Sequence, residues 1–231
     1  SRREEVKTIF DRAAKEIGNV PIVVANDGDV SALAGAMSLH EGAVMGLAMG
    51  TSEAVGYVNA GSSLLGWFSE LAFAPVDLNE RAMRDEWSGD RGVGCKYFSQ
   101  DAVAKLAPAA GIALSERLTP AEKLKEVQKL AEQGLPYAQE IFRSIGVYLG
   151  HTLCLYERLY DIRSLIVLGR VASGVGGELI VAECRRVLEE EYPELAQKLC
   201  VMLPDEKFRR VGQSMAAASL PEISPCRSAR G

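Results

Sequence analysis

The segment SLIVLGRVASGVGGELIVAECRRVL, residues 164–188, constrains the fold more than any other part of the sequence. It opens with an apolar run typical of a strand buried on both faces, passes through a glycine-rich loop, and continues as an amphipathic helical pattern. An apolar run over residues 20–26 is followed in the same way by a helical pattern over 29–39. Strands that alternate with helices predict an α/β fold whose sheet is covered on at least one face.

The other predicted elements complete this alternation. GAVMGLAMG and EAVGYVNAG are typical of strands joined by a turn at residues 50–52, and KLCVML is typical of a short strand. Residues 81–94 are polar and contain glycine, so they predict a loop. Helices are predicted over residues 2–18, 99–109, 120–133, 136–160, 178–192 and 207–219.

Composition excludes several classes of protein. The 231 residues are 48% hydrophobic, which is enough for one or two packed cores. The net charge of -5 without a basic run argues against nucleic-acid binding by this portion. No apolar segment approaches the roughly 20 residues that a membrane span needs. The five cysteines are scattered without a CxxC pair, which predicts reduced thiols in a cytoplasmic protein.

Three loops combine an apolar strand with glycines and with hydroxyl or carboxylate side chains: Asn26-Asp27-Gly28, Gly50-Thr51-Ser52 and Gly169–Gly177. Ligands of open α/β sheets bind beyond the carboxyl ends of strands, where glycine allows backbone N–H groups to approach a phosphate. Each loop alone has a simpler structural explanation, as a hairpin turn or a packing glycine. Together they favour a nucleotide or phosphoryl site.

Asp27 also has two interpretations. Asp and Asn are preferred helix N-caps, and Asp29 before the helical pattern serves that purpose alone. In the functional interpretation, Asp27 lies at the end of a buried strand and acts as a general base on a substrate hydroxyl during phosphoryl transfer. Composition does not choose between the two.

Five motifs, taken in order, resemble the ROK family of sugar kinases and repressors. They are NDGDVSALAG, GLAMGTSEAVGYV, GWFSELAFAPVDLN, SLIVLGRVASGVGGELI and GQSMAAASLP, and the resemblance covers roughly residues 15–221. The family belongs to the actin-like ATPase superfamily, so the resemblance implies a ribonuclease H-like α/β fold. It implies that residues 1–40 end an N-terminal sugar-site domain, that 41–221 form a C-terminal nucleotide-binding domain, and that 222–231 are a tail.

The resemblance also implies roles for single residues. Asp27 would be the base on the sugar hydroxyl, with Asn26 and Glu70 as hydrogen-bonding partners of the sugar. ATP and Mg²⁺ are the cofactors expected for the full-length protein. The residues implied to hold the nucleotide are Gly50, Thr51, Ser52, Gly169, Arg170, Ser173, Gly174 and Gly176.

This sequence departs from the family pattern at several positions. Phe73 stands where the family has histidine, and only Cys95 lies near the place of its cysteine-rich zinc motif, so no zinc is expected. Ser52-Glu53 replaces a glycine pair and puts a negative charge near the expected phosphates, and Arg170 replaces a glycine. The N-terminal Asp-Ile-Gly-Gly-Thr motif has no counterpart. We therefore expect the carboxyl-terminal part of a longer protein, or a homologue that lost its start.

Three functions remain open at this point. The leading one is a ROK-type, ATP-dependent sugar kinase-like protein, and the alternative is a sugar-binding regulator without catalysis. The third is an α/β scaffold whose glycines only pack and whose acids cap helices. The helix over residues 136–160 is expected to lie in the core, and the resemblance implies that it contributes to a homodimer surface.

Overall fold

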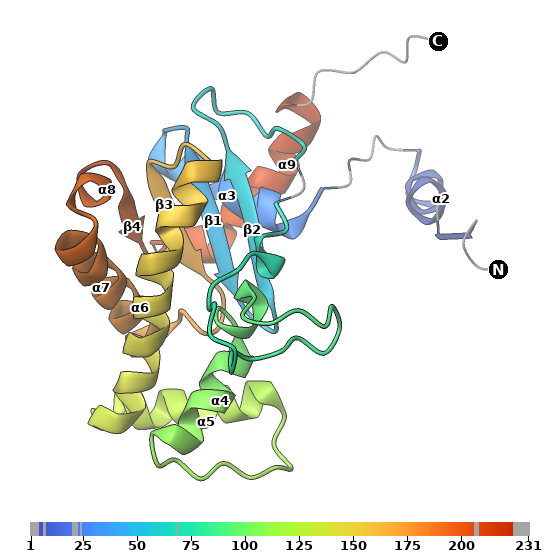
Figure 1. Cartoon of the computed structure of the whole chain (residues 1–231). Helices are drawn as coiled ribbons and strands as arrows, with labels where there is room; N and C mark the ends of the chain where they lie inside the picture. Colours follow the sequence, from blue (N-terminus) through green and yellow to red (C-terminus); the bar gives the residue numbers. More distant parts are fainter. Residues whose placement is uncertain are drawn as a thin grey trace.

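The computed structural model describes residues 5–6, 8–19, 23, 25–67, 69–205 and 208–223. Its strands are β1 (Val44–Met49), β2 (Glu53–Val58), β3 (Ser164–Leu168) and β4 (Cys200–Met202). They form one sheet in the order β2-β1-β3-β4, seen at the centre of Figure 1. The β1–β2 hairpin is antiparallel, whereas β1–β3 and β3–β4 are parallel. The predicted hairpin with its turn at residues 50–52 is confirmed.

The helices begin and end largely where the sequence predicts. Thr119 and Glu122 form a capping box at the start of α5, and Pro193 starts α8 directly after α7 ends. The helices are α2 (Ile9–Glu16), α3 (Asp27–Leu39), α4 (Gln100–Ala109), α5 (Pro120–Glu132), α6 (Pro136–Leu159), α7 (Gly174–Glu191), α8 (Pro193–Lys198) and α9 (Gln213–Ile223). A π-helical turn, Phe208–Gly212, leads into α9.

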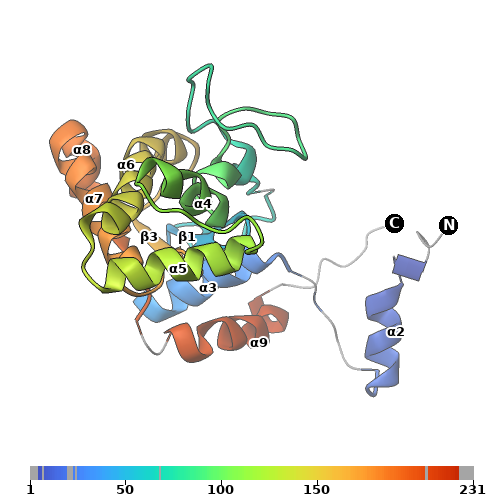
Figure 2. The ribbon, with the colours of Figure 1, turned by 90° about the horizontal axis from the view of Figure 1, so that it is seen from below.

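The sheet carries a separate apolar core on each face. Residues of β1 alternate between them, so that Met45 and Leu47 pack with α4–α7 while Val44 packs with α3 and α9. Figure 2 shows α3 and α9 on one side of the sheet and α6 and α7 on the other. The sheet is therefore covered on both faces, and the predicted α/β fold class is confirmed.

Helix α3 approaches β2 closely because glycines face each other at the contact. A Cβ atom added to Gly56 would lie 2.1 Å from the carbonyl oxygen of Gly28, and one added to Gly28 would lie 2.4 Å from the carbonyl oxygen of Val55. Neither position has room for a side chain. The first turn of α3 is thus fixed directly on the backbone of β2.

Several predicted boundaries are wrong by a few residues. Helix α3 begins at Asp27 and not at 29, because the side chain of Asn26 is the N-cap and accepts a hydrogen bond from the Gly28 N–H at 2.8 Å. Helix α7 begins at Gly174, inside the predicted glycine-rich loop, and α9 continues to Ile223 beyond the predicted end at 219. The predicted strand over 20–26 falls largely outside the described residues.

The predicted domain boundary at residue 40 stays a prediction. Helix α3, which precedes it, packs on the same sheet as the elements that follow it. In the described part of the chain, the search for a helix with the length and apolarity to cross a membrane finds none.

Candidate functional site

A cavity of about 390 Å³ lies where the first turn of α3 meets the start of β2 and the loop before residue 71. We call it the acidic cavity, because its lining residues include two aspartates and two glutamates. Its lining includes Asn26, Asp27, Asp29, Glu53, Trp67 and Glu70. The structure therefore brings together the three predicted sugar-site residues, Asn26, Asp27 and Glu70.

The start of α3 holds Asp27 in place at the rim of this cavity. The Gly28 N–H donates to Oδ1 of Asn26 at 2.8 Å and to Oδ1 of Asp27 at 3.0 Å. The hydroxyl of Ser31 donates to the backbone carbonyl of Asp27 at 2.9 Å. The helix is thus capped by Asn26, and the exposed carboxylate of Asp27 can accept further hydrogen bonds.

The other two carboxylates at the rim differ in environment. Glu70 is exposed and directly precedes the short 3-10 helix Leu71–Phe73. Asp29 lies one residue beyond Gly28 and is half-buried, and burial raises its pKa. Asp29 was missed as a site residue in the sequence because it resembled an ordinary helix cap.

A second cavity, of about 400 Å³, lies beyond the ends of β1 and β3, and we call it the glycine-loop cavity. Its lining includes Ala48, Gly169, Ser173, Gly212 and Gln213. Gly169 has a φ of +89°, and a Cβ there would lie 2.4 Å from the carbonyl oxygen of Met49. Only glycine lets the chain leave β3 this close to β1.

The two cavities are neighbours across the β1–β2 hairpin. Ala48 of the glycine-loop cavity is the cross-strand partner of Ala54 of the acidic cavity. Directly opposed residues of an antiparallel pair lie about 5 Å apart between Cα atoms. A ligand in one cavity and a ligand in the other would therefore lie at the same edge of the sheet.

The predicted nucleotide residues are brought together only in part. Gly169 and Ser173 line the glycine-loop cavity. Gly50, Thr51 and Ser52 form the hairpin turn beside it and are not among the lining residues of either cavity. Thr51 and Ser52 are exposed, and the carbonyl of Gly50 accepts the Gln100 N–H at the start of α4.

The remaining predicted residues lie in or before the first turn of α7. The amide group of Gln128 donates to the Arg170 carbonyl at 2.8 Å and to the Ser173 hydroxyl at 3.1 Å, which ties this loop to α5. Gly174 has a φ of +60° at the start of the helix. A Cβ on Gly176 would lie 2.7 Å from the ring of Phe142, so helix packing explains that glycine.

The side chain of Glu53 does not lie near the expected phosphates, where the resemblance implied that it would place a negative charge. Its position in β2 has the same parity as Val55 and Tyr57, so its side chain enters the core on the α6 face and is 5% exposed. The hydroxyl of Tyr156 donates to Glu53 Oε1 at 3.0 Å, and Oε2 has no hydrogen-bond partner among the described residues. Burial raises the pKa of Glu53 to about 8, so the carboxyl group is mostly protonated at neutral pH. The expected negative charge at the phosphates is therefore absent.

Gln213 is a second residue that the sequence reasoning missed. It follows Gly212 in the motif GQSMAAASLP, which carried the resemblance but to which no role was given. Its amide group donates to the Ser31 hydroxyl of α3 at 2.7 Å. The glycine-loop cavity is thus linked through Gln213 to the helix whose first residue is Asp27.

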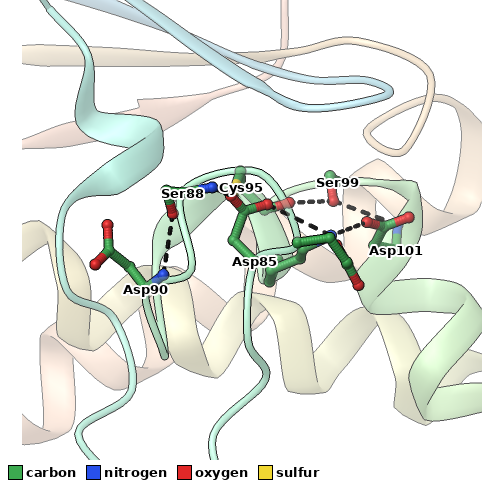
Figure 3. A network of polar contacts seen from close by, with 8 residues as sticks. Asp85, Ser88, Asp90, Cys95, Ser99 and Asp101 are labelled. Atoms are coloured by element: carbon green, nitrogen blue, oxygen red, sulfur yellow. Dashed lines mark hydrogen bonds and ion pairs between the residues drawn. The ribbon is translucent and has the colours of Figure 1, made fainter.

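An ion cluster centred on Lys96 lies directly after Cys95, the residue that the resemblance places near the zinc motif. The Lys96 ammonium lies 2.5 Å from Glu86, 2.7 Å from Asp101 and 3.7 Å from Asp85. Burial alone would lower the pKa of Lys96, but the hydrogen bonds to Asp101 and Glu86 outweigh it and raise the pKa. Figure 3 shows Asp85, from the long loop over residues 74–93, and Asp101, from α4, converging on this cluster. A side-chain ammonium therefore joins the two segments.

Cys95 is unsuited to metal binding in this environment. Burial raises the pKa of its thiol to about 11, and metals bind the thiolate. Within the described residues, no group of three or more His, Cys, Asp or Glu side chains is arranged to hold a metal ion. The expected absence of zinc stays a prediction.

Replacing Lys96 with methionine is expected to lower the melting temperature by about 5 °C, because the carboxylates of the cluster would then repel one another without their cation. Thermal unfolding followed by circular dichroism measures the change. Lys125→Met, on the exposed face of α5, is the matched control and should leave the melting temperature unchanged. An equal melting temperature for both variants would show that the Lys96 cluster does not stabilise the folded protein.

Solved structures with a similar fold include two sugar kinases. A ROK hexokinase from Thermus thermophilus has a TM-score of 0.66 and 19% sequence identity, and the match covers 90% of this chain and 67% of that one. A ROK family glucokinase from Streptomyces griseus, in complex with glucose and AMPPNP, has a TM-score of 0.70 and 21% identity over 91% of this chain and 70% of that one.

A regulator has the same fold. A ROK family transcriptional regulator, a homologue of the E. coli MLC protein, has a TM-score of 0.69 and 17% identity, and the match covers 92% of this chain and 55% of that one. No family model matches the sequence, and the search of curated proteins finds no match either. The chain therefore has the α/β fold that ROK-family sugar kinases share with a ROK-family regulator.

Proposed function

We propose that this protein is a sugar kinase-like protein that binds a sugar in the acidic cavity and transfers the γ-phosphoryl group of ATP to one of its hydroxyls. One observation carries the proposal. Asp27 and Glu70 line one cavity, and that cavity adjoins a glycine-lined cavity across the Ala48–Ala54 strand pair. An acceptor site beside a phosphate-type loop is the arrangement that phosphoryl transfer needs, because catalysis of this reaction consists mainly of positioning and electrostatics.

Asp27 acts as the general base in this proposal. Its carboxylate takes the proton of the reacting hydroxyl, whose oxygen then bonds to the γ-phosphorus while the bond from that phosphorus to the β–γ bridging oxygen breaks. The products are a sugar phosphate and ADP. Asn26 and Glu70 orient the sugar by hydrogen bonds to its other hydroxyls.

The glycine-loop cavity is assigned to the nucleotide. Gly169 and Gly212 let the ligand approach the backbone, and Ser173 adds a hydroxyl at the start of the 18-residue helix α7. Helix N-termini stabilise bound phosphate through their free N–H groups and the helix dipole. The described residues form no cluster for Mg²⁺, so we assign no protein ligand to it. When bound with ATP, Mg²⁺ supplies charge neutralisation of the phosphates.

The negative charge of the acidic cavity limits which sugars can bind there. The carboxylates of Asp27, Asp29 and Glu70 line it beside the protonated carboxyl group of Glu53, and none of its described lining residues is Lys, Arg or His. An anionic sugar, such as a uronic acid or a sugar phosphate, would meet carboxylates without a compensating cation. We therefore propose that the substrate is a neutral sugar or one with an amino group.

We also propose that the protein is cytoplasmic and forms a homodimer. Scattered cysteines without a CxxC pair support a cytoplasmic protein, and the resemblance to the ROK family supports a homodimer. Light scattering of the purified protein measures the oligomeric state directly. A monomeric mass at micromolar concentration would overturn the homodimer.

The function is tested by incubating the protein with ATP, Mg²⁺ and a panel of neutral hexoses and hexosamines while measuring ADP release and sugar phosphate formation. Calorimetry of each sugar without nucleotide separates binding from catalysis. Turnover of at least one sugar is expected. Sugar binding without turnover would instead support the sugar-binding regulator, and the absence of both would overturn the sugar site.

A further inference from the structure

Trp67 is a large apolar side chain that lines the acidic cavity and remains 56% exposed. A single exposed apolar residue is common on protein surfaces and by itself assigns nothing. Trp67 differs because it lines the same cavity as Asn26, Asp27 and Glu70. The cavity therefore combines a flat aromatic face with several hydrogen-bond acceptors.

The indole of Trp67 packs against the first of two buried tyrosines that contact each other. The Trp67 ring lies 5.9 Å from the ring of Tyr160, which lies 5.1 Å from the ring of Tyr57. The hydroxyl of Tyr57 donates to the Asp161 carbonyl at 2.7 Å, so the last ring of the row is anchored. An aromatic side chain supported in this way is ordered before a ligand arrives, and less conformational entropy is lost on binding.

A pyranose ring has the complementary chemistry. Its C–H bonds present an apolar face to an aromatic ring, while its hydroxyls at the edge donate hydrogen bonds to carboxylates. An axial hydroxyl on the stacked face would hold the ring away from the indole. A sugar whose hydroxyls are all equatorial presents only C–H bonds on both faces.

We propose that Trp67 is the platform on which the pyranose ring of an uncharged, gluco-configured sugar stacks in the acidic cavity. This inference rests on the proposed function and specifies its substrate class. Stacking fixes the orientation of the sugar ring, and Asp27 and Glu70 then accept hydrogen bonds from the hydroxyls at the edge of that ring. Trp67 is in this view a positioning and specificity residue, because it contacts the sugar without taking part in the proton transfer.

The chain offers its own fluorescence control, because it contains two tryptophans. Trp87 is 84% exposed, packs against Phe73 at 5.5 Å between rings, and is not among the lining residues of the acidic cavity. In Trp87→Phe, Trp67 is the single indole. Titration of this variant with glucose is expected to change its emission with saturation, whereas Trp67→Phe, which retains Trp87, should show no change.

Calorimetry then measures how much Trp67 contributes to the affinity for glucose. Trp67→Ala is expected to weaken glucose binding about tenfold, Trp67→Phe by about threefold, and the control Trp87→Ala by less than about twofold. Glucose is expected to bind more tightly than mannose or glucuronate. Circular dichroism checks the fold of Trp67→Ala, and the titration of Trp87→Phe, which keeps Trp67 itself, holds even where the alanine variant does not fold.

The outcomes separate this inference from the proposed function. Glucose binding of unchanged affinity in Trp67→Ala, with no emission change in Trp87→Phe, would overturn the platform and leave the sugar site standing. Tighter binding of mannose or glucuronate than of glucose would overturn the proposed substrate class. Failure of every sugar to bind the unmodified protein would overturn both.

Discussion

Asp27→Asn is expected to lower kcat for sugar phosphorylation about a thousandfold, which is within the usual contribution of a positioned general base. Asparagine keeps the shape of the side chain and can still accept a hydrogen bond from a sugar hydroxyl, but it cannot take its proton. The affinity for the sugar should therefore change by less than about threefold. The loss should appear in kcat rather than in KM, because the missing interaction develops in the transition state.

Asp90→Asn is the matched control for this experiment. Asp90 is an exposed aspartate of the long loop and is not among the described lining residues of either cavity. Its replacement should leave kcat within about twofold of the unmodified protein. An Asp27→Asn protein with full kcat would remove Asp27 from the role of base, even if sugar binding were confirmed.

The second large effect concerns Glu53 and the dependence of stability on pH. The pKa of Glu53 is raised to about 8 in the folded protein, whereas its ordinary value is 4.5. Below both values the group is protonated in the folded and the unfolded chain, and it causes no loss of stability. As the pH rises between them, the unfolded chain releases this proton while the folded protein retains it, so the free energy of unfolding falls. The loss is complete above about pH 8.

The expected size follows from about 1.4 kcal/mol for each unit of pKa difference. Between pH 5 and pH 8, Glu53 should lower the free energy of unfolding by about 3 kcal/mol. Glu53→Gln should remove this contribution, because the amide stays neutral and its oxygen can still accept the hydrogen bond from Tyr156. The variant should therefore be more stable than the unmodified protein at pH 8 and similar to it at pH 5.

Urea unfolding at pH 5, 6, 7 and 8 measures this effect. Glu116→Gln, at an exposed position in the loop before α5, serves as the control and should keep the pH dependence of the unmodified protein. A parallel pH dependence for Glu53→Gln and Glu116→Gln would show that Glu53 is ionised in the folded protein at neutral pH.

Much of the fold follows from local sequence patterns. The strand at Ser164–Leu168 is a continuous apolar run, and the hairpin at residues 50–52 joins two such runs, so both were predictable. The start of α3 was not, because Asn26, Asp27 and Asp29 can all cap a helix. Only the three-dimensional hydrogen bond from the Gly28 N–H shows that Asn26 does so.

The convergence of the candidate site residues was predictable from local motifs, and not where it depends on distant contacts. Asn26, Asp27 and Glu70 match positions to which the resemblance assigns sugar-binding roles, whereas Trp67 lies in the same motif as Glu70 without an assigned role. Glu53 did carry a signal, since it alternates with Val55 and Tyr57 along β2. A carboxyl group is rarely buried without a partner, and that general expectation was stronger than the alternation.

The contact between Gly28 and Gly56 has a consequence for how this protein tolerates change. Because a methyl group at either position would overlap the opposite backbone, the helix could accept it only by moving away from the strand, and Asp27 would move with it. For the proposed phosphorylation of a sugar, a screen of random variants for lost turnover should thus recover Gly56, a residue that no ligand needs to touch. Inherited variation in that strand should be as restricted as in the cavity itself.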